Sequence, residues 1–210
     1  QAQTAEELTQ LGITKRNAND YIGALQDFNT AVLITPSFDV YYNRGLVLHL
    51  LGNYSSAARS FSNAIAINAN DKLAYLNRGK AYFATGDHAA AILDFNKVTE
   101  MDTTLSEAFY YQGLCKKVAG EYQQALLAYN KSLEIDTTNS DVYAARAEAQ
   151  YFLENDSAAL QDFDKAIELN ANNALAYFNR GTCRFSINDK ENACVDWTKA
   201  SELKYLEADT

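Results

Sequence analysis

The sequence predicts an all-α fold, an α-solenoid of six helical hairpins stacked one after another. Glycine recurs at a fixed interval, because Gly45, Gly79 and Gly113 follow one another every 34 residues. A repeat of about 20–50 residues is the sequence signature of a solenoid. The 210-residue chain also holds a single proline, so almost nothing in it interrupts helices. Its 48% hydrophobic content excludes a disordered chain and is enough to bury a core.

Six repeats follow from this interval, and together they predict a single domain over residues 1–210. The proposed repeats are residues 5–37, 38–71, 72–105, 106–139, 140–173 and 174–207. Repeat positions are counted from the first residue of each. Several positions keep one class of residue in all six repeats, so each repeat is expected to have the same structure.

The first helix of each repeat is predicted from apolar residues that recur with helical periodicity. In the third repeat these are Tyr75, Ala81 and Tyr82. Position 8 is small in every repeat, and it is Ala147 in the fifth repeat, where the others have glycine. A small residue there lets the two helices of a hairpin approach each other closely.

A turn at position 15 is predicted to end the first helix. Gly52, Gly86 and Gly120 hold this position in three repeats, and glycine adopts the left-handed backbone conformation without strain. Asn19 and Asn188, the next-best residues for that conformation, hold it in the first and last repeats.

The second helix of each repeat has small residues at positions 20 and 27 and an aromatic residue at position 24. The aromatic residues are Phe28, Phe61, Phe95, Tyr129, Phe163 and Trp197. We expect their rings to fill the space beside the close contact at position 8. Polar stretches at residues 68–71, 136–139 and 170–173 then supply caps and turns between repeats. Twelve helices joined by short loops are therefore predicted.

These positions resemble the tetratricopeptide repeat family. The second repeat carries the pattern as Tyr41, Gly45, Tyr54, Ala57, Phe61 and Ala64. The resemblance covers residues 5–207, although the proline typical of the family is present only at Pro36 and is Tyr205 in the last repeat. It implies a right-handed superhelix whose first helices line a concave groove, and a partner that is a protein or a peptide.

The outer positions of the array predict polar ends. Position 3 should face the preceding repeat, and it is Val40 in the second repeat but Glu7 in the first. Position 28 should face the following repeat, and it is Ser201 in the last, although Thr99 in the third repeat is polar as well. We therefore expect a complete array with solvated ends.

Nothing in the sequence predicts catalysis, a cofactor or a bound metal ion. His49 and His88, the two histidines, stand at different repeat positions with no carboxylate or cysteine at metal-ligand spacing. No glycine-rich phosphate loop or nucleophile motif is present. The net charge of −9 without a basic run argues against nucleic acid as a partner. No apolar run is long enough to predict membrane insertion.

The three cysteines allow two interpretations. Cys115 and Cys183 share position 10, and Cys194 lies at position 21, where the other repeats have small or apolar residues. Buried, unpaired thiols are therefore expected. The alternative is a disulfide bond between Cys183 and Cys194, which would join the two helices of the last repeat.

The binding site is expected on the first helices, at positions 2, 5, 6, 9, 12 and 13, whose side chains do not pack inside the array. An asparagine side chain can both donate to and accept from a peptide backbone, and aromatic rings add apolar contact. The candidate groove residues are Tyr42, Asn43, Leu46, Leu76, Asn77, Tyr110, Tyr111, Phe178 and Asn179. Asparagines so placed resemble the asparagine ladders of some peptide-binding members of the family.

Other interpretations stay open. The asparagines could serve only local helix contacts, and the chain could be an assembly module that forms a homo-oligomer or acts through its convex face and ends. A carboxylate clamp for the acidic C-terminus of a chaperone is disfavoured. Glu107 and Tyr111 stand where the clamp of the family needs basic residues, and an acidic terminus would meet like charge.

Charge is concentrated in the fifth repeat, where seven acidic residues against Arg146 and Lys165 sum to −5. Asp141 and Glu148 are expected on the groove side, so a partner with basic character is favoured. Arginine at position 7 is expected to pack within hairpins or to form ion pairs between repeats. These arginines are Arg44, Arg78, Arg146 and Arg180.

Two short segments bear on localisation. Residues 1–4, Gln-Ala-Gln-Thr, resemble the N-terminus that cleavage of a secretory leader leaves on some bacterial exported proteins. Residues 193–197, Ala-Cys-Val-Asp-Trp, resemble the closing repeat of many bacterial tetratricopeptide repeat proteins. Together they favour a bacterial exported or periplasmic protein, while a chain trimmed at Gln1 would begin in the same way. The partner and the organism stay open.

Overall fold

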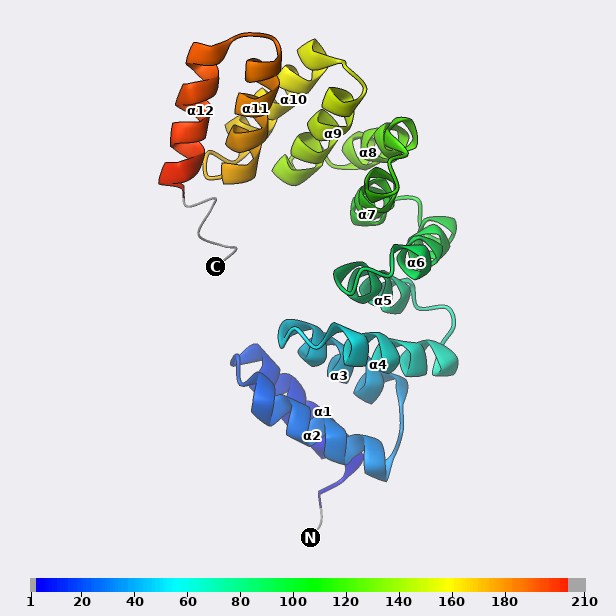
Figure 1. Ribbon diagram of the computed structural model, residues 1–210. Coiled ribbons are helices and arrows are strands. Elements are labelled where there is room, and N and C mark those ends of the chain that lie inside the picture. Colours follow the sequence, from blue (N-terminus) through cyan, green and yellow to red (C-terminus); the bar gives the residue numbers. More distant parts are fainter. Residues whose placement is uncertain (1–2, 204–210) are drawn as a thin grey trace. The chain divides into compact units, whose positions relative to one another are not determined.

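The computed structural model describes residues 3–203 and is helical throughout this range (Figure 1). Residues 3–203 form twelve helices joined by short loops, and this range contains no strand. The predicted all-α helical repeat solenoid is therefore confirmed. The expectations placed on Gln1, Ala2 and Tyr205 lie outside the described residues, as does the rest of the sixth repeat beyond Leu203.

The helices belong to two compact halves of the chain, and the boundary between the halves in the sequence falls after Thr103. The N-terminal half contains α1 (Ala5–Asn17), α2 (Tyr21–Ile34), α3 (Phe38–Leu50), α4 (Tyr54–Ile67), α5 (Lys72–Ala84) and α6 (His88–Met101). The C-terminal half contains α7 (Ser106–Val118), α8 (Tyr122–Ile135), α9 (Ser140–Phe152), α10 (Asp156–Leu169), α11 (Ala174–Ser186) and α12 (Lys190–Glu202). A single domain over residues 1–210 stays a prediction.

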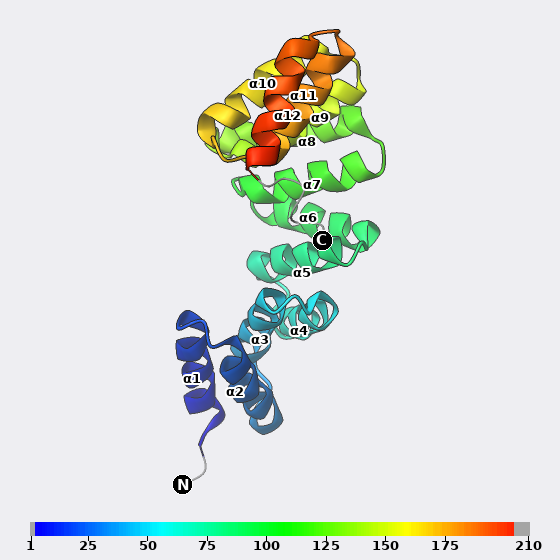
Figure 2. The same cartoon turned by 60° about the vertical axis from the view of Figure 1, so that its left-hand side comes forward.

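Within each half, every helix packs against the next one in the chain. The pairs α1 with α2 and α11 with α12 lie side by side in both Figure 1 and Figure 2. The first helices of neighbouring repeats also contact each other, so that α3 touches α1 and α5 in one half, and α9 touches α7 and α11 in the other. Each half therefore has one face made of first helices alone.

Glycine at position 8 and the aromatic ring at position 24 are in direct contact. A Cβ atom on Gly45 would lie 2.6 Å from Cε1 of Phe61, and one on Gly113 would lie 2.3 Å from Cε1 of Tyr129. These distances leave no room for a side chain, so the ring of the second helix packs on the backbone of the first. The predicted close approach is confirmed, and both rings are fully buried.

The turns at position 15 adopt the predicted left-handed conformation. The φ angle is 73° at Gly52, 82° at Gly86 and 64° at Asn19. The fifth repeat adds a case that its sequence does not predict, because Glu154 has a φ of 60°. A long charged side chain is uncommon in this region, where glycine and asparagine are favoured.

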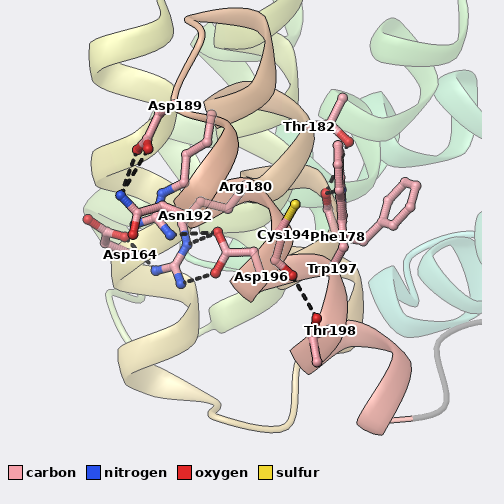
Figure 3. Close-up of polar contacts among 11 residues, drawn as sticks. Asp164, Phe178, Arg180, Thr182, Asp189, Asn192, Cys194, Asp196, Trp197 and Thr198 are labelled. Atoms are coloured by element: carbon pink, nitrogen blue, oxygen red, sulfur yellow. Dashed lines mark hydrogen bonds and ion pairs between the residues drawn. The ribbon is translucent and has the colours of Figure 1, made fainter.

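Arginine at position 7 connects three helices at once. Arg78 on α5 donates to both carboxylate oxygens of Asp94 on α6, at 2.8 and 2.7 Å, and to Ser62 Oγ on α4, at 3.1 Å. Arg180 on α11 pairs in the same way with Asp196 on α12, at 2.9 and 2.6 Å, and reaches Asp164 on α10 at 2.6 Å (Figure 3). The expected ion pair between repeats is confirmed for Arg180, whereas Arg78 reaches the preceding repeat through Ser62 and Arg44 bonds to the neutral Asn29 and Ser60.

The cysteines are unpaired, so the alternative of a bond between Cys183 and Cys194 is wrong. The Sγ atom of Cys183 lies 3.9 Å from the carbonyl oxygen of Asp156, at the start of α10, in the preceding repeat. Cys194 is exposed on α12, and no described helix follows α12 to cover it. The expectation of burial therefore holds for Cys115 and Cys183 and is wrong for Cys194.

Candidate functional site

A hollow of about 610 Å³ lies on the first-helix face of the N-terminal half. Its lining includes Thr9, Gln10 and Ile13 on α1 and Asp39 and Asn43 on α3. These residues stand at positions 5, 6 and 9 of the first repeat and positions 2 and 6 of the second, which are among the positions expected to face a groove. The hollow is rich in hydroxyl, amide and carboxylate groups.

The asparagines at position 6 of this half are engaged within the protein. Asn43 accepts a hydrogen bond from Arg16 at 2.7 Å, and its Nδ2 donates to the carbonyl of Asp39 at 2.8 Å. Asn77 Nδ2 donates to the carbonyl of Leu73 at 2.9 Å and to the hydroxyl of Tyr42 at 3.1 Å. The local helix contacts raised as an alternative are therefore present, and they leave only part of each side chain for a partner.

The apolar candidates of this half mostly pack. The ring of Tyr42 stacks on Phe38 with centroids 5.5 Å apart and meets Phe61 edge-on at 5.8 Å. Desolvation by this packing raises the pKa of Tyr42, so its hydroxyl stays protonated. Leu46 is half-buried against the same core. Leu76 is only 4% exposed, so it belongs to the interior rather than to an open lining.

A second hollow, of about 320 Å³, lies on the first-helix face of the C-terminal half and is called the groove pocket here. Three consecutive first helices, α7, α9 and α11, line it. Its residues are Tyr110, Leu114, Lys117, Asp141, Ala144, Ala145, Glu148, Asn173 and Leu175. The two alanines of α9 leave the middle open, and the larger side chains of α7 and α11 flank them.

Polar contacts cross the groove pocket from one helix to the next. Lys117 on α7 forms an ion pair with Glu148 on α9, and Asn179 on α11 donates to the other carboxylate oxygen of Glu148 at 2.8 Å. Asp141 on α9 is exposed, and one of its oxygens lies 3.4 Å from Nδ2 of Asn173. As expected, Asp141 and Glu148 both lie on the groove side.

Of the remaining candidates, Tyr111 and Phe178 are not part of the lining of this pocket. Tyr110 lines it and meets Tyr111 edge-on, with centroids 5.4 Å apart. Burial raises the pKa of Tyr110, and the nearby carboxylates Asp141 and Glu148 act in the same direction. Phe178 is half-buried, and its carbonyl accepts from Trp197 Nε1 at 3.2 Å and from Thr182 Oγ1 at 3.1 Å (Figure 3).

Eight of the nine lining residues were not among the candidate groove residues, although Asp141 and Glu148 were expected on the groove side. Leu114, Lys117 and Leu175 stand at positions 9, 12 and 2, so the position rule that predicted the groove already contained them. Asn173 is different, because it precedes the first position of its repeat and caps α11 by accepting from the backbone N–H of Ala176 at 3.0 Å. Its lining role depends on how α11 begins.

Metal sites and membrane-spanning helices are both absent from the described part of the chain. Residues 3–203 contain no group of three or more histidine, cysteine, aspartate or glutamate side chains arranged to hold a metal ion. In the same range, no helix has the length and apolar character needed to cross a bilayer.

Two protein-family models match parts of the chain. One, described as a TPR repeat, matches residues 45–86. The other, described as a tetratricopeptide repeat, matches residues 73–104 and 140–173, close to the third and fifth repeats proposed from the sequence. No curated protein matches the chain.

Solved structures share the fold at low sequence identity. A tetratricopeptide repeat protein from Parabacteroides merdae is 22% identical with a TM-score of 0.75, over 97% of this chain and 80% of that one. YrrB, described as a TPR protein with an unusual peptide-binding site, is 21% identical with a TM-score of 0.71, over 82% and 89%. PilF of Pseudomonas aeruginosa is 18% identical with a TM-score of 0.79, over 98% and 93%. At these identities the similarity shows the fold.

Proposed function

Because the chain is a tetratricopeptide repeat protein, we propose that it is a scaffold that binds an extended peptide or a partner helix against its first helices. This fold is typical of protein–protein interaction scaffolds, which are generally not catalytic. The observation that carries the proposal is the groove pocket, where three consecutive first helices present apolar and polar side chains to one open hollow. The peptide-binding site in the description of the similarly folded YrrB supports it.

Asn77 and Asn179 support the extended-peptide form of the proposal. In both, the side-chain nitrogen donates within the protein, and among residues 3–203 no donor reaches the Oδ1 atom. An open carboxamide oxygen can accept from the backbone N–H of a bound peptide whatever its side chains are. Asn43 is less suited to this, since its Oδ1 already accepts from Arg16.

Affinity capture from source-cell extract tests the proposal. The groove variant carries Asn77→Ala and Asn179→Ala, and the control carries Asn63→Ala and Asn192→Ala, two asparagines on second helices of the same two halves. We expect the control to retain a partner of the wild type and the groove variant to lose it. Helical content and melting temperature are compared first, because all variants must be folded. Equal capture by both variants would place the contact elsewhere.

An assembly module is the second candidate function, and three exposed side chains favour it. Leu93 on α6, Leu127 on α8 and Val195 on α12 all stand at position 22, and each is more than half exposed. Apolar side chains on second helices could join copies of the chain. Sedimentation at increasing protein concentration tests this, since a constant monomer mass would remove self-association.

A further inference from the structure

We propose that the groove pocket recognises a protein segment in which an aliphatic side chain stands next to a lysine or arginine. The inference rests on the proposed function, because it names the chemistry of the partner at that site. Its grounds are the shape of the pocket and its charge.

The shape of the pocket suits one aliphatic side chain. Leu114 on α7 and Leu175 on α11 flank Ala144 and Ala145 on α9, so apolar groups surround a space that small residues keep open. The hollow of about 320 Å³ is far larger than the share of about 30 Å³ that one water molecule takes in the liquid. Leu175 is 41% exposed, and a bound side chain would remove part of that apolar surface from water.

The charge of the pocket suits a cation beside that side chain. Glu148 and Asp141 both line the pocket, and Lys117 is the one basic residue in the lining. Lys117 is already paired with Glu148. Asp141 receives only the 3.4 Å contact from Asn173, and within residues 3–203 no cationic side chain pairs with it. A lysine or arginine of the partner would find an unpaired carboxylate there, whereas an acidic segment would be repelled.

Selection from a displayed library of short random peptides tests the inference on the full chain. Three variants accompany the wild type. Asp141→Asn removes the unpaired carboxylate, and Leu175→Ala shortens an apolar wall. Glu134→Gln removes the same charge from an exposed site on α8 and is the matched control. We expect the wild type to enrich peptides in which an aliphatic residue neighbours lysine or arginine.

Fluorescence anisotropy with the enriched peptides then measures affinity. We expect Asp141→Asn to weaken binding about two- to fivefold, the range for an exposed ion pair, and to abolish the preference for a basic residue. Leu175→Ala should relax the aliphatic preference, and Glu134→Gln should bind as the wild type does. Equal weakening by Asp141→Asn and Glu134→Gln would overturn the inference, because only the net charge would then matter.

The outcomes separate this inference from the proposed function. Enriched peptides that lack the basic residue but still lose binding in Leu175→Ala would overturn the inference and keep the scaffold function. A library that yields no peptide would argue against both. A dimer in sedimentation that Leu175→Ala dissociates would mean that a second copy of the chain fills the pocket, which also overturns the inference.

Discussion

Asp196 on α12 is almost enclosed by protein, with 1% of its side chain exposed. Arg180 donates to both of its carboxylate oxygens, and Arg184 donates to Oδ2 at 2.7 Å. Charge-assisted hydrogen bonds of this kind offset the desolvation of the carboxylate. Removal of the negative charge would leave Arg184 without this counter-ion and Arg180 with the exposed Asp164 alone.

Asp196→Asn is therefore expected to lower the free energy of unfolding by about 3 kcal/mol. The matched variant, Asp164→Asn, breaks an ion pair of the same arginine, but 59% of the Asp164 side chain is exposed. Asp164→Asn should lower the free energy of unfolding by less than about 1 kcal/mol. Urea denaturation followed by circular dichroism measures both, and equal losses would contradict this account of Asp196.

The cysteines are expected to differ in reactivity. Burial raises the pKa of Cys115 and of Cys183 to about 11, whereas Cys194 is exposed. A thiol-specific chromophore at pH 8 should label one thiol quickly in the folded protein and the other two only after denaturation, and Cys194→Ser should remove the fast phase. Since the raised pKa values belong to the folded state, the two buried thiols should also destabilise it as the pH rises from about 8.5 to 11. Three equal labelling rates would contradict the burial.

At the scale of single elements, the turns decide where each first helix ends. Gly52, Gly86 and Gly120 take positive φ at position 15, and Asn188 does so in the last repeat. Glu154 takes the same conformation although it has a Cβ atom, so the fifth repeat holds a strained turn.

Glu154→Gly is expected to raise the free energy of unfolding by about 0.5–1 kcal/mol, because relief of the strain exceeds the entropy that glycine adds to the unfolded chain. Gly86→Ala, which places a Cβ atom at φ 82°, should lower it by about 1–2 kcal/mol. Thermal melts of the two variants provide the measurement. A lower melting temperature for Glu154→Gly would show that contacts of the Glu154 side chain stabilise the fold by more than the strained backbone destabilises it.

At the scale of the whole molecule, each half has its own buried rings and its own hollow. Phe61 packs on Gly45 in the N-terminal half, and Phe163 packs beside Ala147 in the C-terminal half. In repeat proteins, stability is close to a sum of local terms and of contacts between neighbours. A substitution that removes a buried ring from one half should therefore lower the stability of that half most.

Phe163→Ala is expected to lower the free energy of unfolding by about 3–5 kcal/mol, because it leaves a cavity where a ring that is only 1% exposed was packed. Hydrogen exchange should speed up most in α9 to α12 and least in α1 to α4. Phe61→Ala should give the converse pattern, and it serves as the matched control. Uniform acceleration along the chain in both variants would show one cooperative unit instead.

The fold was predictable because its close contacts recur in the sequence. Gly113 and Tyr129 touch as the spacing of small and aromatic residues predicted. The turn at Glu154 was not predictable, because nothing in a glutamate indicates a positive φ. The exposure of Cys194 depends on which helices follow α12. A comparison of the six repeats with one another does not supply that information.

The candidate site was predictable only in part. Among the residues that the position rule named, Tyr110 lines the groove pocket and Asn179 donates to Glu148 in its lining, and the same rule contains Leu114 and Leu175. It could not tell that Leu76 packs inside, because an apolar residue at position 5 can turn toward solvent or toward the core. Which of the two happens is decided by the packing of neighbouring helices.

The arginines at position 7 have a further consequence for the history of such a chain. Arg78 and Arg180 reach acceptors on second helices, and neither lines the hollow of its half. These arginines thus hold successive hairpins together without facing a partner, whereas Glu148 in the groove pocket also joins neighbouring repeats. Substitutions at lining residues such as Leu175 can change the ligand while the arginines keep the hairpins together, so repeats of this kind can diverge in recognition while they conserve their architecture.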